Sequence, residues 1–220
     1  MRILLATQNP HKLVEMRSAS AGSGLDWVLL GDIAAERGIA LPPEPDEPEP
    51  TFEGNALIKA RFYAAWAGMP AASDDSGLAV DALGGAPGVR SARYSGLGDT
   101  RDERDAANNA KLLDALGDRP AAARTARFVC ALALAWPDDR DIDGKARPPI
   151  VVRGEVPGRV LTAPRGSNGF GYDPLFELTG DTPPFAGRTT AELAPAEKDA
   201  ISHRGRAVRA LVERLGGDAK

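Results

Sequence analysis

Three features of the sequence predict an α/β fold for this chain of 220 residues. Residues 2–6 (RILLA) form a short apolar run that is typical of a buried strand. A helix is expected soon after it, because Asn9 can cap a helix and Pro10 suits the first helical position. Residues 26–31 (DWVLLG) have the pattern of a second strand. This order of strand, helix and strand favours an α/β architecture.

A connector and a second helix follow. Residues 41–50 (LPPEPDEPEP) contain five prolines and four acids, which predicts a stiff, solvated linker. Thr51 is a suitable cap for the next helix, and Gly68 and Pro70 are expected to end it.

The remainder of the chain also mixes strands, helices and turns. We expect a short strand that ends at Asp74 and Asp75, and another strand at residues 77–81. Residues 163–176 contain three glycines and two prolines, so they cannot form regular structure. The apolar periodicity predicts a helix at residues 102–117, long strands at 126–136 and 149–156, and a closing helix from about Pro195.

The composition limits the classes of function. A net charge of −4 and 5% aromatic residues argue against a nucleic-acid-binding protein, which would be more basic and richer in stacking side chains. The lone cysteine, Cys130, lies in an apolar run, so a reducing compartment is expected. The N-terminal apolar run is too short for a signal peptide, and no stretch approaches the length of a membrane span. We therefore expect a cytoplasmic protein with no nucleic-acid or membrane partner.

Asp74 and Asp75 are the first candidates for chemistry. Adjacent strand residues point to opposite faces, so the pair could simply be solvated at a strand end. Ser76 and Gly77 follow at once and predict a tight exit from the strand. Ligands of α/β sheets bind beyond the carboxyl ends of strands, and a carboxylate there suits a hard divalent cation or a base for water.

The loop after the first strand offers groups that suit phosphate oxygens. Residues 7–12 (TQNPHK) supply a hydroxyl, two amides, a helix N-terminus and the ammonium of Lys12. The loop has no glycine, so it is neither a Walker loop nor a dinucleotide-binding loop. An Asn cap before a helix is common for structural reasons alone, and His11 is most simply a surface residue.

Residues 166–174 (GSNGFGYDP) could enclose a planar ligand. Their glycines allow close backbone approach, Phe170 and Tyr172 can stack on a base, and Asp173 can accept hydrogen bonds. An ordinary turn with two aromatic side chains in the core fits the same residues. Three further donors lie close together in the sequence: Lys198, His203 and Arg204. A charged, solvated helix face explains those donors equally well.

Together these groups are the inventory of a nucleoside triphosphate site without a Walker loop. Five stretches also resemble, in order, the inosine triphosphate/xanthosine triphosphate pyrophosphatase family. They are LLATQNPHKLVEM, TFEGNALIKAR, ASDDSGLAVDALGGAPGVRSARYSG, RGSNGFGYDPLF and AELAPAEKDAISHRGRA. The resemblance spans nearly the whole chain, whereas composition and spacing alone indicate only a site for nucleotide phosphates.

The resemblance implies a fold and a reaction. The fold would be a long, curved mixed sheet with helices forming two lobes around a central cleft, so that residues 1–220 make a single two-lobed domain, usually in a homodimer. The reaction would be Mg²⁺-assisted attack of water on the α-phosphorus of dITP, ITP or XTP. It would release the nucleoside monophosphate and pyrophosphate and so cleanse the nucleotide pool.

The resemblance also implies roles for particular residues. Asp75 would be the catalytic base and a Mg²⁺ ligand, with Asp74 beside it and Lys59 facing the triphosphate. The residues that bind substrate would be Thr7, Gln8, Asn9, Pro10, His11, Lys12 and Ser76, together with Phe170, Gly171, Tyr172, Asp173, Lys198, His203 and Arg204.

A second acidic metal ligand is expected upstream of the TFEGNA stretch. The proline-rich linker offers four acids for this role, and spacing favours Glu47 over Glu44, Asp46 and Glu49.

Selectivity for the base would depend on donors that meet a 6-oxo group. Such donors favour hypoxanthine and xanthine over adenine, by roughly 10⁴-fold where a site is built for one hydrogen-bonding group. Guanine shares the 6-oxo group, so its rejection depends on the 2-amino position. Two other functions stay open: a related pyrophosphatase for modified pyrimidines, and a regulatory protein that binds nucleotides without turnover. A nucleic-acid-binding module built on residues 203–209 is disfavoured by the acidic charge.

Overall fold

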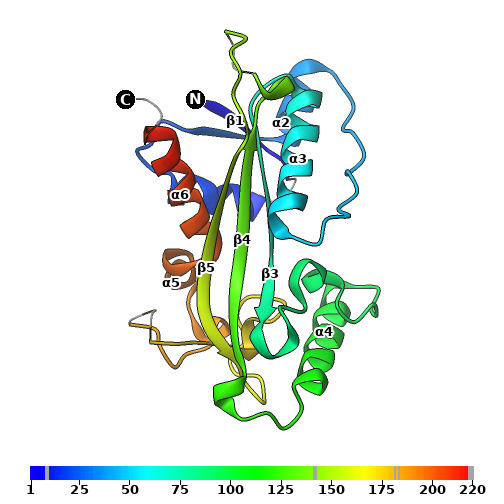
Figure 1. The fold of residues 1–220 in the computed structure, drawn as a ribbon, viewed down its shortest axis with the longest axis vertical. Coiled ribbons are helices and arrows are strands. Elements are labelled where there is room, and N and C mark those ends of the chain that lie inside the picture. The colour runs from blue at the N-terminus through cyan, green and yellow to red at the C-terminus, as the bar shows by residue number, and fades with distance from the viewer. Residues whose placement is uncertain (8–9, 141–142, 181, 183, 218–220) are drawn as a thin grey trace. The chain divides into compact units, whose positions relative to one another are not determined.

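The computed structural model confirms an α/β fold built on a six-stranded sheet, in the order β2-β1-β3-β4-β5-β6 (Figure 1). It describes residues 1–7, 10–140, 143–180, 182 and 184–217. The strands are β1 (Arg2–Leu5), β2 (Asp26–Leu29), β3 (Ala71–Val80), β4 (Thr125–Ala135), β5 (Ile150–Val160) and β6 (Phe176–Leu178). The helices are α1 (Pro10–Ala19), α2 (Leu30–Arg37), α3 (Phe52–Ala67), α4 (Arg101–Leu116), α5 (Pro195–Ile201) and α6 (His203–Gly217). The sheet is mixed, because β1 is parallel to β2 and β3 whereas β5 and β6 are antiparallel.

The chain divides into two compact units. Unit 1 comprises Met1–Asp75, Cys130–Gly154 and Arg204–Lys220, and unit 2 comprises Ser76–Val129 and Glu155–His203. Strands β3, β4 and β5 each contribute residues to both units.

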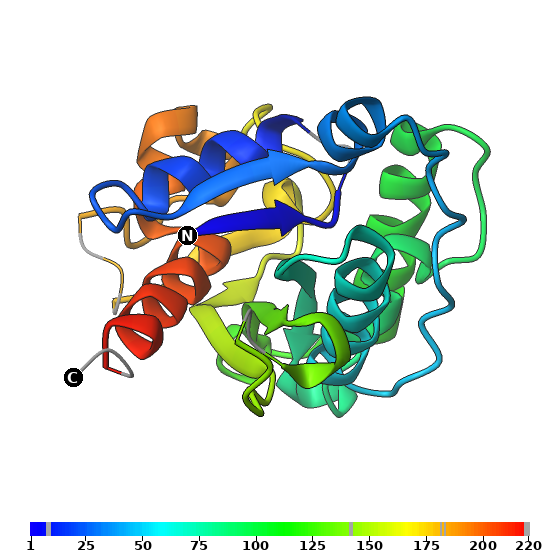
Figure 2. The ribbon, with the colours of Figure 1, turned by 90° about the horizontal axis from the view of Figure 1, so that it is seen from above.

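The core of unit 1 forms around the parallel strands β1 and β2, which lie side by side in Figure 2. Ile3 pairs with Trp27 in the register of these strands, and both side chains are fully buried. Leu132 of β4 and Leu211 of α6 belong to the same cluster of buried residues. Buried parallel strands favour continuous apolar runs, which explains the short sequence RILL in β1.

Unit 2 has a separate core. Leu112 and Leu116 of α4 are fully buried with Phe176 of β6. The buried guanidinium of Arg124 donates to the carbonyls of Gly117, Val160 and Leu161, at 2.8–3.0 Å. Arg124 therefore satisfies backbone acceptors at the ends of α4 and β5 that would otherwise be costly to bury.

Three predicted elements differ from the structure. β3 is one continuous strand rather than two short ones, so Asp74 and Asp75 lie within it and Ser76 does not form an exit. Helix α2 replaces the predicted end of the second strand, where the carboxylate of Asp32 accepts the backbone N–H of Leu29 at 3.1 Å. The closing helix is two helices, α5 and α6, because Ser202 between them has an extended backbone (ψ 144°).

Helix α3 agrees with its predicted ends. The hydroxyl of Thr51 accepts the N–H of Gly54 at 3.1 Å, and Gly68 closes the helix in the left-handed conformation. The linker before it contains no helix or strand between residues 41 and 49. Among the described residues, no helix has both the length and the apolarity needed to cross a membrane.

Candidate active site

The predicted acid pair lies at the carboxyl edge of the parallel strands in unit 1. Leu5, the last residue of β1, pairs with Ala72 of β3. Asp74 and Asp75 therefore extend past the end of β1, where the chain leaves toward α1. This edge is the one at which open α/β sheets bind ligands, so the predicted location holds even though β3 continues through the pair.

Asp74 is buried and forms ion pairs with two cations. Lys12 Nζ lies 2.8 Å from Asp74 Oδ1, and the guanidinium of Arg204 donates to Oδ2 at 3.1 and 3.2 Å. The same guanidinium contacts Glu15 at 2.5 Å. Burial alone would raise the pKa of Asp74, but the charges of Lys12 and Arg204 lower it well below its usual value. A carboxylate held this firmly in its ionised form positions Lys12 rather than accepting a proton.

Asp75 has different surroundings. It is half-buried, and its Oδ2 accepts a hydrogen bond from Asn55 Nδ2 at 3.3 Å. Burial raises the pKa of Asp75; the charge of Lys59 opposes that shift, and the negative charge of Glu47 adds to it. A carboxylate with a raised pKa next to a second carboxylate suits a general base or a cation ligand.

Helix α3 brings Glu47 to this carboxylate. Asn55 and Lys59 are four residues apart, so they lie on the same helix face. Asn55 holds the backbone of Glu49, because its Nδ2 donates to the Glu49 carbonyl at 3.2 Å and its Oδ1 accepts the Glu49 N–H at 3.0 Å. Lys59 pairs with Glu47 at 2.5 Å. No role was predicted for Asn55 from the sequence. The signal that could have identified it is an asparagine within an apolar helix, because such a residue is rarely fully buried, as Asn55 is.

The donor set fits a hard divalent cation that is shared with a ligand. Glu47 and Asp75 supply carboxylate oxygens and are close enough for their charges to interact. Within the described part of the chain, no group of three or more His, Cys, Asp or Glu side chains is arranged to hold a metal ion. Mg²⁺ is commonly held by one or two carboxylates together with phosphate oxygens, so these two acids are sufficient for that mode of binding.

Some predicted phosphate-binding residues cannot be compared with the structure. Gln8 and Asn9, together with the side chains of Pro10 and His11, lie outside the described residues. Thr7 is half-buried and lies two residues after the end of β1.

The predicted base-binding loop forms a second cluster, in unit 2. Phe170 is 57% exposed, whereas Asp173 is buried. Asp173 Oδ2 accepts the N–H of Phe170 at 2.8 Å and pairs with Lys198, and Oδ1 accepts the hydroxyl of Thr190 at 2.7 Å. Residue 169 must be glycine, because a Cβ there would lie 2.9 Å from Asp173 Cγ and the backbone has φ +78°. Asp173 therefore fixes the loop, and Phe170 is the member that presents an accessible ring.

Tyr172 is buried rather than exposed beside Phe170. Its ring belongs to the core of unit 2, and its hydroxyl donates to the carbonyl of Ser91 at 2.9 Å. Burial raises the pKa of this hydroxyl well above its usual value. Tyr172 thus anchors the loop as a core residue. For Tyr172 this agrees with the alternative interpretation of the sequence, in which the aromatic side chains of an ordinary turn pack in the core.

The three predicted donors near the closing helices have different neighbours. Lys198 lies with Asp173 and Phe170, its Nζ 4.9 Å from the centre of the Phe170 ring. His203 stacks on Phe128 with 5.3 Å between ring centres. Arg204 binds Asp74 and Glu15 in unit 1, so its donors are used by carboxylates.

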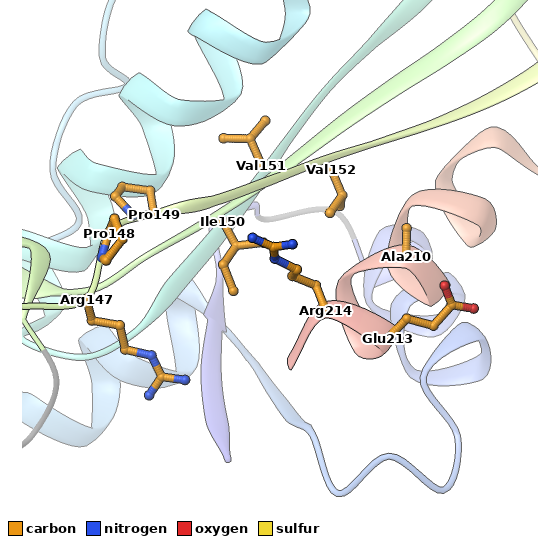
Figure 3. A pocket seen from close by; sticks show the side chains of 9 residues that line it. All are labelled: Arg147, Pro148, Pro149, Ile150, Val151, Val152, Ala210, Glu213 and Arg214. Carbon is orange, nitrogen blue, oxygen red and sulfur yellow. The ribbon is translucent and has the colours of Figure 1, made fainter. Parts of the chain in front are cut away.

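Unit 1 also contains a cavity of about 660 Å³ that is separate from these residues. Figure 3 shows side chains from both of its walls, including Arg147, Val152, Glu213 and Arg214. None of the predicted site residues lines it. Because its lining contains a single acid, it lacks the pair of carboxylates that distinguishes the edge of β1 and β3.

The mixed sheet, with carboxylates and cations gathered at the edge of its parallel strands, defines an α/β protein with a site suited to phosphate groups. The chain belongs to the Ham1 family, whose model matches residues 3–214. It is 52% identical over 220 residues to a dITP/XTP pyrophosphatase of Frankia alni, covering 98% of this chain and 97% of that one. It is 47% identical over 219 residues to a dITP/XTP pyrophosphatase of Mycobacterium tuberculosis, covering 97% and 95% of the two chains.

Solved structures give the same result for the fold. A HAM1 protein from Coxiella burnetii is 38% identical, with a TM-score of 0.80 and 99% of each chain covered. A nucleoside-triphosphatase, or dITP/XTP pyrophosphatase, from Mycobacterium abscessus is 45% identical, with a TM-score of 0.73. That match covers 98% of this chain and 100% of the other.

Proposed function

We propose that this protein hydrolyses the non-standard purine nucleoside triphosphates dITP, ITP and XTP to the monophosphate and pyrophosphate. The activity named for its relatives supports the reaction, and the resemblance of its motifs supports the substrate class. The observation that carries the proposal is the setting of Asp75. This half-buried carboxylate has a raised pKa and lies among Asn55, Lys59 and Glu47 at the carboxyl edge of parallel strands.

In the proposed reaction, Asp75 accepts a proton from the water that attacks the α-phosphorus. The new bond joins the water oxygen to that phosphorus, and the bond from phosphorus to the bridging oxygen breaks, so that pyrophosphate leaves with the electron pair. Asn55 orients the carboxylate by donating to its Oδ2. A raised pKa favours proton transfer at neutral pH, because a base works best when its pKa approaches the working pH.

Cations of the chain would neutralise the phosphates. Lys12 and Lys59 are both partly exposed, with 28% and 13% of their side chains accessible, so each can contact a ligand while paired with its acid. A Mg²⁺ held by Asp75 and Glu47 would add charge neutralisation and lower the pKa of the attacking water. Phosphoryl chemistry depends mainly on such positioning and charge compensation.

The loop in unit 2 would bind the base. Phe170 offers an exposed ring for stacking, and Lys198 supplies the ammonium of this cluster, which can donate to a 6-oxo group. An amine at that position would leave the donor unpaired, which gives selectivity against adenine.

A panel of substrates tests the proposal. Pyrophosphate release is measured from ITP, XTP, dITP, GTP, ATP and dUTP, with Mg²⁺ and with EDTA. We expect the first three to be the best substrates and EDTA to abolish turnover. Rates on GTP and ATP equal to those on ITP, XTP and dITP would contradict the proposed selectivity. Binding of ITP without pyrophosphate release would favour a regulatory protein instead.

We further propose that residues 1–220 act as one two-lobed domain, in a cytoplasmic homodimer. The resemblance to the family supports this assembly. One chain has a mass of 23.1 kDa. Light scattering of the purified protein at micromolar concentration should give twice that mass. A monomer mass with full activity would remove dimerisation from the account.

A further inference from the structure

One face of α4 contacts the loop that carries Phe170. Arg101, Asp105 and Asn109 follow each other at intervals of four residues, which places them on the same side of the helix. The guanidinium carbon of Arg101 lies 4.3 Å from the centre of the Phe170 ring. All these residues belong to unit 2.

Two of these side chains hold a single loop residue, Gly171. The N–H of Gly171 donates to Asp105 Oδ2 at 2.8 Å, and Asn109 Nδ2 donates to the carbonyl of Gly171 at 2.8 Å. Both backbone hydrogen-bonding groups of Gly171 are thus taken by one helix. Arg101 lies 3.9 Å from Asp105 in turn. We refer to Asp105 and Asn109 as the Gly171 clamp.

Asn109 makes this contact at a cost to stability. Its Oδ1 is buried and has no hydrogen-bond partner among the described residues. The reverse orientation of the amide would put that oxygen against the Gly171 carbonyl, so the orientation is set by the loop. A buried acceptor without a partner is destabilising, and such groups call for a functional explanation.

We propose that Asp105 and Asn109 are positioning residues that keep Phe170 in the geometry that binds the purine base. The inference rests on the proposed function of the loop. Phe170 is exposed and has a glycine on each side, so its conformation depends on contacts made by its neighbours. Without the clamp the loop would occupy its binding geometry for only part of the time, and apparent affinity falls in proportion to that fraction.

The test uses Asp105→Ala, Asn109→Leu and the double variant in the full-length protein. Asn109→Leu keeps the branched shape and the number of heavy atoms of the side chain but removes both its unpaired acceptor and its donor to the Gly171 carbonyl, so its Tm is measured to verify that it folds. Asp114→Ala is the matched control, because Asp114 is an exposed acid on the same helix. Hydrogen exchange of the peptide covering residues 166–175 is measured without nucleotide, and KM and kcat are measured for ITP.

We expect faster exchange of that peptide in both single variants and not in the control. KM for ITP should rise about 3- to 10-fold, the factor expected for loss of one hydrogen bond, while kcat changes less than KM. The double variant should be less affected than the sum of the two single effects, because both side chains hold the same residue. Unchanged exchange in Asp105→Ala and Asn109→Leu would overturn the clamp. If the variants exchange faster but the wild-type protein releases no pyrophosphate, the clamp is supported and the proposed function is rejected.

Discussion

Asp74 and Asp75 are neighbours in β3, yet their surroundings move their pKa values in opposite directions. Lys12 and Arg204 hold Asp74 in its ionised form, whereas burial and Glu47 favour the protonated form of Asp75. Pairs of acids with such different surroundings divide their tasks, one for structure and charge and one for proton transfer. We therefore propose that Asp74 positions Lys12 and that Asp75 acts as the base.

Replacement of Asp74 by asparagine should destabilise the protein at neutral pH. The change leaves the buried Arg204 and the partly buried Lys12 without their shared carboxylate, and breaking a buried pair costs about 3 kcal/mol of unfolding free energy. Urea unfolding at pH 7 measures this loss. The exposed change Asp114→Asn serves as the control and should be close to neutral.

The ion pairs of Asp74 also predict the direction in which the free energy of unfolding changes with pH. The pKa of Asp74 is lower in the folded protein than the value of about 3.9 in the unfolded chain. Its contribution to stability is therefore complete above that value and declines as the pH falls below about 4. The stability gap between wild type and Asp74→Asn should therefore narrow as the pH falls from about 4 to about 2, because the folded-state pKa lies well below the unfolded-state value. A constant gap across this range would contradict the assignment.

At the level of elements, β3 tolerates no side chain at position 77. A Cβ on Gly77 would lie 2.7 Å from the carbonyl of Gly88 and would collide with the hydroxyl of Ser91. Gly77→Ala should therefore cost about 1–3 kcal/mol of unfolding free energy. Gly31 in α2 has open space around it, so Gly31→Ala should stabilise by about 0.5–1 kcal/mol. Two urea curves check both values, and a neutral Gly77→Ala would contradict the close packing.

The elements also show what the sequence could predict. Both ends of α3 were predicted correctly because capping is local: Thr51 meets Gly54, and Gly68 adopts a conformation that suits glycine. The continuity of β3 was missed, because it depends on backbone pairing with β1 and β4, which are distant from it in the chain. The role of Asn55 was missed for a similar reason, because its partner Asp75 lies on another element.

At the scale of the whole molecule, two cores are joined by strands that run through both. All three tryptophans, at positions 27, 66 and 136, belong to unit 1, so tryptophan fluorescence reports on that unit. Far-UV circular dichroism reports on the backbone of both units. Because β3, β4 and β5 are continuous, we expect both units to unfold together. Tryptophan fluorescence and far-UV circular dichroism should then give one urea midpoint. Midpoints that differ, with two-step circular dichroism, would show that the units unfold separately.

We propose Asp75 as the base of a pyrophosphate-releasing reaction, and the variant Asp75→Asn removes only the basic oxygen. The amide cannot accept the proton, so kcat for pyrophosphate release from ITP should fall by at least about 10²-fold. The free energy of unfolding should stay the same or increase, because burial disfavours the charge at this position. A stable Asp75→Asn protein that retains near-normal kcat would show that Asp75 is not the base.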